Sequence, residues 1–318
     1  VIYSRNTVLS TLDFKKSVSR TIIHVQNYGR LKMTHLKPND PDYDNGPGIL
    51  NEILSEGVVS LGPFSYHVKE CVIPEGVCGT IEGWSGGYRN VHSGLTQIRP
   101  TSDWDGTSPL ITWSELTPGR ATARNVHVKD VRFVQTLTDN EAVSRTGIGL
   151  QFKAADVWVV ERCEFWGWET GLEAGDPGQP LVNLSVRDSI FVSCHRGFRN
   201  VTGVPTIACI WLANNHFQDC GKDDASSPGG GAIIQGGAAH CIGPANRFED
   251  NLGRGLRLHD VKETTIQGNY FEDNPHANML VTASGSGMSA YIGPNSWDAS
   301  GYTVNSPAKA YKLCACET

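Results

Sequence analysis

The sequence contains no apolar run long enough to cross a membrane and no cluster of lysine and arginine residues. A membrane-spanning helix needs about 20 consecutive apolar residues, and a general nucleic-acid-binding protein needs a clustered basic face. The formal net charge of the 318 residues is −6. We therefore expect neither a membrane nor a nucleic acid among the partners of this protein. Methionine is also scarce, with 3 residues against 35 glycines, a composition typical of a β protein with many turns.

An internal repeat runs through most of the sequence. Residues 241–258, CIGPANRFEDNLGRGLRL, and residues 266–282, IQGNYFEDNPHANMLVT, share the order Asn, any residue, Phe, Glu, Asp, Asn. Aromatic residues in the same position follow each other at intervals from 271 − 248 = 23 to 165 − 133 = 32 residues. Such periods indicate a solenoid. The series is Phe133, Phe165, Phe191, Phe217, Phe248, Phe271 and Trp297.

Each repeat has short segments of alternating apolar and polar residues on both sides of the aromatic. VWVVERCEF and NLSVRDSIF end at it, and GAIIQ and GLRLH follow it. Segments of this kind, bounded by Gly, Asn and Asp, are typical of β-strands. A unit of about 25 residues buries its apolar side only when it stacks on its neighbours. We therefore predict that the aromatics at 165, 191, 217, 248 and 271 form one interior column.

An asparagine stands two residues before the aromatic in four repeats. Asparagine tolerates a left-handed backbone, and its amide can bond to the same group in the next coil. The pattern predicts an asparagine ladder at a tight turn. We interpret the repeated Glu-Asp-Asn, at 249–251 and 272–274, as a solvated turn with stacked asparagine, with a calcium-binding ladder as the alternative. The members of the predicted ladder are Asn215, Asn246, Asn269 and Asn295.

These repeats resemble the right-handed parallel β-helix of the pectin-lyase-like superfamily, which includes polysaccharide lyases, glycoside hydrolases and phage tailspikes. Ile49, Leu50, Ile53 and Leu54 have the spacing of the amphipathic helix that commonly closes such a solenoid. The resemblance implies an all-β, single-stranded right-handed parallel β-helix with an N-terminal capping helix. It divides the chain into an N-terminal arm and capping helix at 1–56, the β-helix at 57–300 and a C-terminal tail at 301–318.

The superfamily shares a scaffold rather than a reaction. The resemblance implies that the protein binds an extended, acidic polysaccharide and depolymerises it, outside the cell or on a virion. Likeness to tailspikes implies a homotrimer. We favour β-elimination by a polysaccharide lyase. Two alternatives stay open: a tailspike-like glycoside hydrolase with paired carboxylates, and a non-catalytic viral or cell-surface adhesin.

In this superfamily the active groove follows the sheet that comes after the aromatic turn. With Ile148, Leu150, Leu172 and Leu256 facing inward, the residues between them point outward. Polar groups then gather in the middle coils. The first predicted outward column holds Gly149, Glu173, Arg199, Ile233, Arg257 and Leu280; the second holds Gln151, Gly175, Val201, Gln235, His259 and Thr282.

Proton abstraction beside a carboxylate needs a group that neutralises the carboxylate and a base near the acidic C–H. Arg199 and Arg257 are predicted to neutralise it, and His259, which titrates near working pH, is predicted to act as base or acid. Glu173 completes the predicted catalytic set. Glu173 and Arg199 are equally explained as a cross-strand ion pair.

The predicted substrate-binding residues lie around this set. Trp166 offers an indole face to a sugar ring, and Gln151 and Gln235 offer amides. For a hydrolase, two carboxyl groups about 5–5.5 Å or roughly 6.5–9.5 Å apart would be needed. Glu169, Glu173 and Asp176 are candidates for such a pair. We predict no metal site and no certain cofactor, and calcium stays open. The predicted substrate-binding residues are Gln151, Trp166, Gln235, Asp176 and Glu169.

The chain has nine cysteines, an odd number. Cys194 and Cys220 each come three residues after the repeat aromatic, so we expect them to stack in successive coils. The sequence leaves open whether they are buried free thiols or a disulfide.

Overall fold

The computed structural model describes residues 36–84, 95–114, 125–135, 145–177, 179–201, 207–221, 229–283 and 288–297, and the backbone of two later strands at 302–305 and 312–313. The chain divides into two compact units, Val1–Lys37 and Pro38–Thr318. Of the first unit only Leu36 and Lys37 are described. The fold below is that of the second unit.

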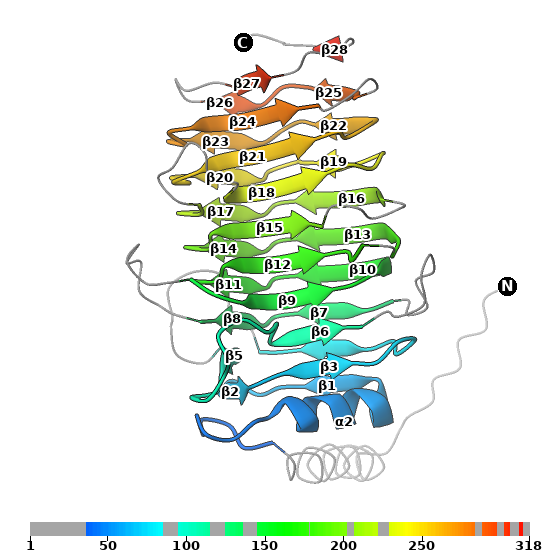
Figure 1. Ribbon diagram of the computed structural model, residues 1–318, viewed down its shortest axis with the longest axis vertical. Helices are drawn as coiled ribbons and strands as arrows, with labels where there is room; N and C mark the ends of the chain where they lie inside the picture. The colour runs from blue at the N-terminus through cyan, green and yellow to red at the C-terminus, as the bar shows by residue number, and fades with distance from the viewer. Residues whose placement is uncertain are drawn as a thin grey trace, which may run out of the picture. The chain divides into compact units, whose positions relative to one another are not determined.

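The second unit is a parallel β-helix in which each coil contributes one strand to each of three sheets (Figure 1). The three sheets have ten, nine and nine strands, and we name them sheets A, B and C in the order in which a coil passes through them. Strands that are neighbours in a sheet belong to successive coils and pair in parallel. The predicted all-β solenoid is confirmed.

The strands have the following bounds. Sheet A consists of β1 (Val58–Ser60), β4 (Thr80–Glu82), β7 (His127–Lys129), β10 (Ala155–Glu161), β13 (Leu181–Arg187), β16 (Ile207–Ala213), β19 (Cys241–Ile242), β22 (Thr264–Ile266), β25 (Ala290–Ile292) and β28 (Lys312–Leu313). Sheet B consists of β2 (Ser65–Val68), β5 (Gln97–Pro100), β8 (Arg132–Val134), β11 (Glu164–Trp166), β14 (Ile190–Val192), β17 (His216–Gln218), β20 (Arg247–Glu249), β23 (Tyr270–Glu272) and β26 (Ser296–Trp297). Sheet C consists of β3 (Cys71–Ile73), β6 (Ile111–Trp113), β9 (Ile148–Phe152), β12 (Thr170–Ala174), β15 (Arg196–Asn200), β18 (Gly230–Gln235), β21 (Arg254–His259), β24 (Ala277–Thr282) and β27 (Tyr302–Asn305).

The predicted capping helix is α2 (Gly46–Glu56), which packs against β1 and β3 at the first coil (Figure 1). Ile49 and Ile53 lie on its buried face. The helix ends at Gly57, whose left-handed backbone (φ 71°) lets its N–H reach the carbonyl of Ile53 at 2.9 Å. Within the described residues, no helix is long and apolar enough to cross a membrane.

Strand pairing continues beyond residue 300, where β27 and β28 join β24 and β25. The predicted division of the chain at residues 56 and 300 stays a prediction.

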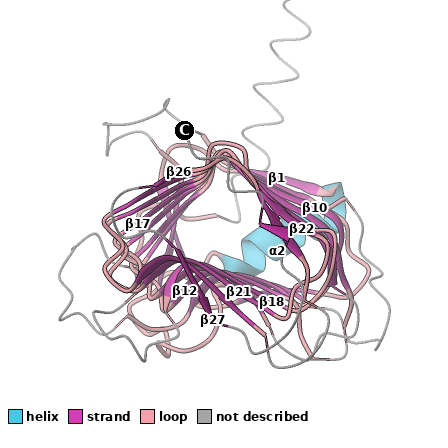
Figure 2. Ribbon diagram, turned by 90° about the horizontal axis from the view of Figure 1, so that it is seen from above, coloured by secondary structure: helices cyan, strands magenta, loops and turns pink. Residues whose placement is uncertain are grey.

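In the coils from β10 to β24, the bend from sheet A to sheet B and the bend from sheet B to sheet C each contain a residue with a left-handed backbone. Asp, Asn and Gly adopt this backbone most easily, which explains why they recur at fixed positions. Figure 2 shows the three sheets around a common interior, and this interior is filled by buried side chains. The bends from sheet A to sheet B include Asp130 (φ 58°), Arg162 (50°), Asp188 (54°), Asn214 (53°), Ala245 (64°) and Gly268 (66°); those from sheet B to sheet C include Gly167 (74°), Ser193 (51°), Asp219 (52°), Asp250 (53°) and Asp273 (48°).

The repeat aromatics form the predicted interior column. The rings of Phe165 and Phe191 are parallel within 5°, with centroids 4.8 Å apart, and this stacking continues through each later coil to Trp297. All five predicted phenylalanines are fully buried. A coil spacing of about 4.8 Å lies within the distance at which two offset aromatic rings stack, so each ring contacts the ring of the next coil.

The asparagine ladder is also confirmed. Asn215 donates from Nδ2 to Oδ1 of Asn246 at 3.0 Å, and Asn246 and Asn269 repeat the bond to the next coil at 2.8 and 2.9 Å. A second buried ladder joins Asn251 to Asn274 at 2.8 Å, so the repeated Glu-Asp-Asn does place stacked asparagine at a turn. Cys194 and Cys220 occupy the same position in earlier coils as buried free thiols.

Candidate functional site

The outward side of sheet C carries the column that the sequence predicted, with one correction. Glu173 pairs with Arg199, Arg199 with Ile233, and Ile233 with Arg257, as predicted. Gln151 also belongs to this column, directly beside Glu173, and not to the second column. Gly149, predicted to face outward in this column, faces the interior.

The reason for this error is a break in the alternation at the start of each strand of sheet C. A side chain at Gly149 would meet Phe165 at 3.3 Å and Trp168 at 3.2 Å, so this position faces the core. The next residue, Leu150, is buried as well. Counting by two from Ile148 turns Gly149 outward, so Gly149 took the place beside Glu173 that belongs to Gln151.

Glu173 is the centre of a polar ladder across three coils. Its Oε1 accepts a hydrogen bond from Nε2 of Gln151 at 2.7 Å, and its Oε2 accepts one from Nε of Arg199 at 2.5 Å. A second guanidinium nitrogen of Arg199 contacts the same carboxylate. Glu173 is only 4% exposed. The predicted cross-strand ion pair is therefore present, and the carboxylate has protein partners on both oxygens.

Glu169, just before β12, is the second carboxylate with cationic partners. Its Oε1 accepts from Nδ1 of the buried His195 at 2.8 Å and from Arg196 at 2.6 Å. Burial alone would raise the pKa of Glu169, but the hydrogen bond and charge of His195 and the charge of Arg196 hold that pKa below its ordinary value. Glu169 is thus kept as an anion at the edge of sheet C.

Arg257 differs from Arg199 because no described residue forms an ion pair with it. Its Nε is buried and has no hydrogen-bond partner within the part of the chain that the structure describes. Arg257 and Arg199 lie two strands apart, which corresponds to about 10 Å between their Cα atoms, with Ile233 between them. The side chain of Arg257 therefore lies on the outward face of sheet C, and none of the described residues accepts a hydrogen bond from its Nε.

Two further arginines lie on this face and were missed by the sequence prediction. Arg196 and Arg254 start β15 and β21, and both pair with Gly230 of the intervening strand. Burial and the nearby charge of Arg257 lower the pKa of Arg254. The signal that could have revealed them is the repeated Arg-Gly-x-Arg, RGFR at 196–199 and RGLR at 254–257.

His259 lies beside Gln235 in the second outward column, as predicted. Its Nδ1 is 2.8 Å from the hydroxyl of Thr282, which itself donates to the carbonyl of Leu258 at 3.3 Å. Since the hydroxyl proton is used in this way, Nδ1 is the donor of this bond, and Nε2 is the unprotonated nitrogen of the neutral ring. Nε2 lies 3.2 Å from a carboxylate oxygen of Asp260.

The remaining predicted residues lie elsewhere. Trp166 is on the outer side of sheet B, because the bend at Gly167 separates it from Glu169. Its indole N–H donates to Glu164 at 3.1 Å, and the guanidinium of Arg132 lies 5.7 Å from the ring centre. The structure therefore does not bring Trp166 to the predicted site.

Asp176 follows β12 at the edge of sheet C, with one carboxylate oxygen 3.9 Å from Nζ of Lys153. No three His, Cys, Asp or Glu side chains of the described segments are placed to hold a metal ion together.

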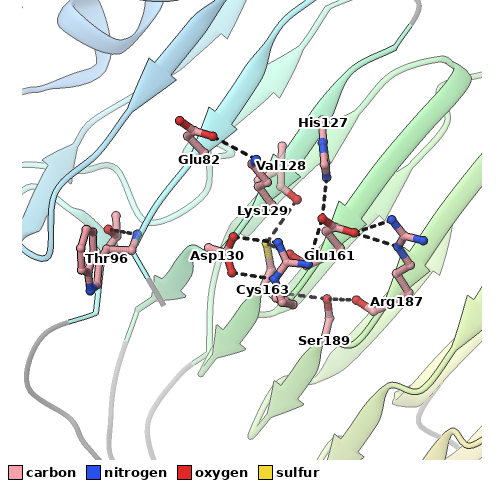
Figure 3. Close-up of polar contacts among 12 residues, drawn as sticks. Glu82, Thr96, His127, Val128, Lys129, Asp130, Glu161, Cys163, Arg187 and Ser189 are labelled. Atoms are coloured by element: carbon pink, nitrogen blue, oxygen red, sulfur yellow. Dashed lines mark hydrogen bonds and ion pairs between the residues drawn. The ribbon is translucent and has the colours of Figure 1, made fainter. Parts of the chain in front are cut away.

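A separate charged cluster lies on the outer side of sheet A (Figure 3). Glu161 accepts two bonds from Arg187, at 2.9 and 2.5 Å, and lies 3.2 Å from Nε2 of His127. Lys129 pairs with Glu82 at 3.0 Å in the same sheet. Each carboxylate is matched by a cation from a neighbouring coil, so we interpret this cluster as cross-strand stabilisation.

Comparison with known proteins agrees with this architecture. A family model described as the right-handed β-helix region matches residues 137–302, that is, 302 − 137 + 1 = 166 of the 318 residues. No curated protein matches the sequence.

Two solved structures resemble the fold. The enzymatically active domain of tailspike protein 2 from bacteriophage CBA120 superposes with a TM-score of 0.59 at 11% identity, over 87% of this chain and 45% of the tailspike domain. A mutant DFA-IIIase from Arthrobacter chlorophenolicus A6, in complex with DFA-III, gives a TM-score of 0.59 at 12% identity, over 83% of this chain and 67% of the enzyme. This chain thus spans less than half the length of the tailspike domain. The match of the family model over more than half of the sequence, together with the three parallel sheets, shows that the chain belongs to the right-handed β-helix family.

Proposed function

We propose that this protein binds an extended acidic polysaccharide along the outer face of sheet C and cleaves it by β-elimination. The observation that carries the proposal is Arg257, whose buried Nε has no partner in the described structure. A buried N–H without an acceptor costs about 1–3 kcal/mol, which a bound carboxylate or hydroxyl oxygen would recover. Arginine also binds carboxylates through two parallel hydrogen bonds.

The neighbouring side chains suit an anionic ligand. Arg254 and Arg257 lie on one strand, and the glycine and isoleucine of β18 separate them from Arg196 and Arg199. On a sheet, an extended polymer that crosses the strands meets one coil about every 4.8 Å. Gln235 and His259, adjacent in the second column, would then face the hydroxyls of the bound sugars.

In the proposed reaction, Arg257 pairs with the carboxylate of a uronate residue and thereby makes the neighbouring C–H more acidic. His259, two residues further along the strand and about 7 Å away at its Cα, accepts that proton on Nε2. The electron pair forms a carbon–carbon double bond, and the glycosidic oxygen leaves and takes up a proton from His259 or water. Thr282 holds Nδ1, and Asp260 stabilises the imidazolium.

The carboxylates on this face favour elimination over hydrolysis. A glycosidase needs one carboxyl group that stays protonated and can act as an acid. Glu173 has both oxygens bound by Gln151 and Arg199, and the lowered pKa of Glu169 disfavours its protonated form. Neither is suited to be that acid.

The fold supports an enzyme of this kind, since the tailspike match is to an enzymatically active domain. On the same likeness we propose that the protein acts outside the cell or on a virion and forms a homotrimer.

The test is to incubate the protein with a set of uronate-containing polymers and to follow both the absorbance of unsaturated products and the release of reducing ends. A lyase gives both signals, and Arg257→Ala loses them while its melting temperature is unchanged. Arg187→Ala, which removes an arginine from sheet A, is the matched control and keeps both signals.

Release of reducing ends without the absorbance of unsaturated products would show that the reaction is hydrolysis and not elimination. If the protein binds the polymer without either signal, and Arg257→Ala loses this binding, the sheet C site is the binding site of an adhesin. Binding and turnover that are unaffected in Arg257→Ala would overturn the site itself.

A further inference from the structure

A groove of 720 Å³ lies far from sheet C, at the bend from sheet A to sheet B in the last coils. This volume falls within the range of about 300–1,000 Å³ that is typical of small-molecule sites. Figure 2 places this bend, near β26, across the solenoid from β18, β21 and β27 of sheet C. The groove is lined by residues of four successive coils, among them Asn214, Ala245, Arg247, Gly268, Tyr270 and Ser296.

The groove exists because side chains at this bend become shorter toward the C-terminal coils. The left-handed residue of the bend is Arg162 and Asp188 in earlier coils, then Asn214, Ala245 and finally Gly268. The shorter residues leave a hollow beside the asparagine ladder, whose buried members Asn246 and Asn269 form part of its lining. The hollow is therefore a local property of the coils from Asn214 onward.

Tyr270 forms the wall of the groove and is held in one orientation. Its hydroxyl donates to Glu272 at 2.7 Å, and the guanidinium of Arg247, from the coil before, lies 5.6 Å from the ring centre. On its other side Tyr270 pairs with Ser296, whose small, exposed side chain cannot cover the ring. Tyr270 is 37% exposed. One face of a fixed aromatic ring is therefore open to the groove.

The polar groups around the ring are those that bind hydroxyls. Arg247 uses Nε and one terminal nitrogen on Glu249, which leaves donors of its five N–H groups for a ligand. The amide of Asn214 and the hydroxyl of Ser296 also line the groove. Rings with polar edges and an apolar face, such as pyranoses, match an aromatic wall flanked by hydrogen-bonding groups.

The charges exclude an anion as the preferred ligand. The positive charge of Arg247 is matched by Glu249, and two further carboxylates, Glu272 and Asp188, bond to the groove residues Tyr270 and Asn214. His216 pairs with the same Glu249 at 2.9 Å. This excess of carboxylates contrasts with the arginine-rich face of sheet C. An anion would be repelled here, and a neutral sugar, which the exposed ring and the hydrogen-bonding groups suit, would not.

We propose that this groove is a second carbohydrate site, which binds a neutral sugar residue stacked on Tyr270. It is separate from the sheet C site and does not require that site to be catalytic. Its role is to hold a glycan at a distance from the place where the acidic polymer binds.

The experiment uses neutral methyl glycosides of glucose, galactose and mannose and the corresponding hexasaccharides at millimolar concentration. Binding is measured by saturation-transfer NMR and calorimetry with the full chain. At least one probe should bind, and Tyr270→Ala should raise the Kd for that probe by about tenfold or more. Ser296→Trp, which fills the space opposite the ring, should have the same effect and guards against misfolding of the first variant.

Tyr291→Ala is the matched control, since Tyr291 is 38% exposed on sheet A and does not line the groove. It should bind the probe normally, as should Arg257→Ala. The proposal is overturned if no probe binds, if binding survives both groove variants, or if the Tyr291→Ala control loses it equally. Preferential binding of tetramethylammonium over every glycoside would also overturn it.

Discussion

Arg199 and Glu173 form an ion pair between adjacent coils of sheet C, with Nε of the arginine 2.5 Å from Oε2 of the glutamate. The carboxylate is almost completely buried, whereas the arginine side chain is 32% exposed. Two arginines that a sequence pattern treats as equivalent, Arg199 and Arg257, therefore have different surroundings. Arg199 is held by the buried Glu173, whereas no described residue forms an ion pair with Arg257.

Arg199→Ala should destabilise the protein, because it leaves the buried carboxylate of Glu173 with one neutral partner. Breaking a buried pair costs about 3–5 kcal/mol, and the partial exposure of Arg199 reduces our expectation to about 2–3 kcal/mol. Chemical denaturation measures this change. The double variant with Glu173→Gln should recover most of the loss, and Arg257→Ala should change the free energy of unfolding by less than about 0.5 kcal/mol. Equal costs for the two arginines would contradict this distinction.

The asparagine ladder should be more important for stability than its exposed neighbours. Asn246→Ala removes the acceptor for Asn215 and the donor for Asn269, both buried. Each unsatisfied buried amide costs about 1–3 kcal/mol, so we expect a loss of at least about 2 kcal/mol. The control is Gln267→Ala, an exposed residue two positions before Asn269, for which denaturation should show a much smaller loss. A mild effect of Asn246→Ala would mean that water replaces the ladder.

The sheet A cluster predicts sensitivity to acid. Burial alone would raise the pKa of Glu161, but Arg187 and Arg162 hold it below the ordinary value of 4.5. A carboxyl with a lowered folded-state pKa contributes stability above its unfolded pKa and loses it as the pH falls through the folded value. The melting temperature of the wild type should thus drop more steeply below pH 4.5 than that of Glu161→Gln. The exposed Glu263→Gln serves as control and should follow the wild type; parallel curves for Glu161→Gln would contradict the prediction.

Trp166→Ala should leave polymer binding unchanged, in contrast to the sequence prediction. The indole lies on sheet B, between Glu164 and Arg132, and not on the face that carries Arg257. A binding titration with the same uronate polymer measures this directly. A large loss of affinity in Trp166→Ala at unchanged melting temperature would show that Trp166 does contribute to polymer binding.

The fold was predictable because its determinants repeat in every coil. Phe165, Phe191 and Asn215 each recur at a fixed position, so one correct register predicts many contacts. The site was less predictable because its residues do not repeat and depend on the exact alternation within one strand. Because Gly149 and Leu150 both face inward, simple alternation from Ile148 put Gly149 in the position beside Glu173 that Gln151 occupies.

Bends and contacts across coils account for the other errors. A single left-handed glycine, Gly167, put Trp166 on another sheet. The ion pairs of Glu169 and the contacts of His259 were not predicted, because they depend on side-chain conformation, which strand periodicity does not specify.

The central claim, that Arg257 on sheet C recognises a carboxylate of an acidic polysaccharide, is tested most directly with one polymer in two forms. The affinity of the wild type and of Arg257→Ala is measured for a polyuronate and for the same polymer after chemical reduction of its carboxyl groups. We predict that the wild type binds the polyuronate at least about tenfold more tightly than the reduced polymer and that Arg257→Ala loses this difference. Equal binding of both forms by the wild type, or an unchanged preference in the variant, would contradict the account.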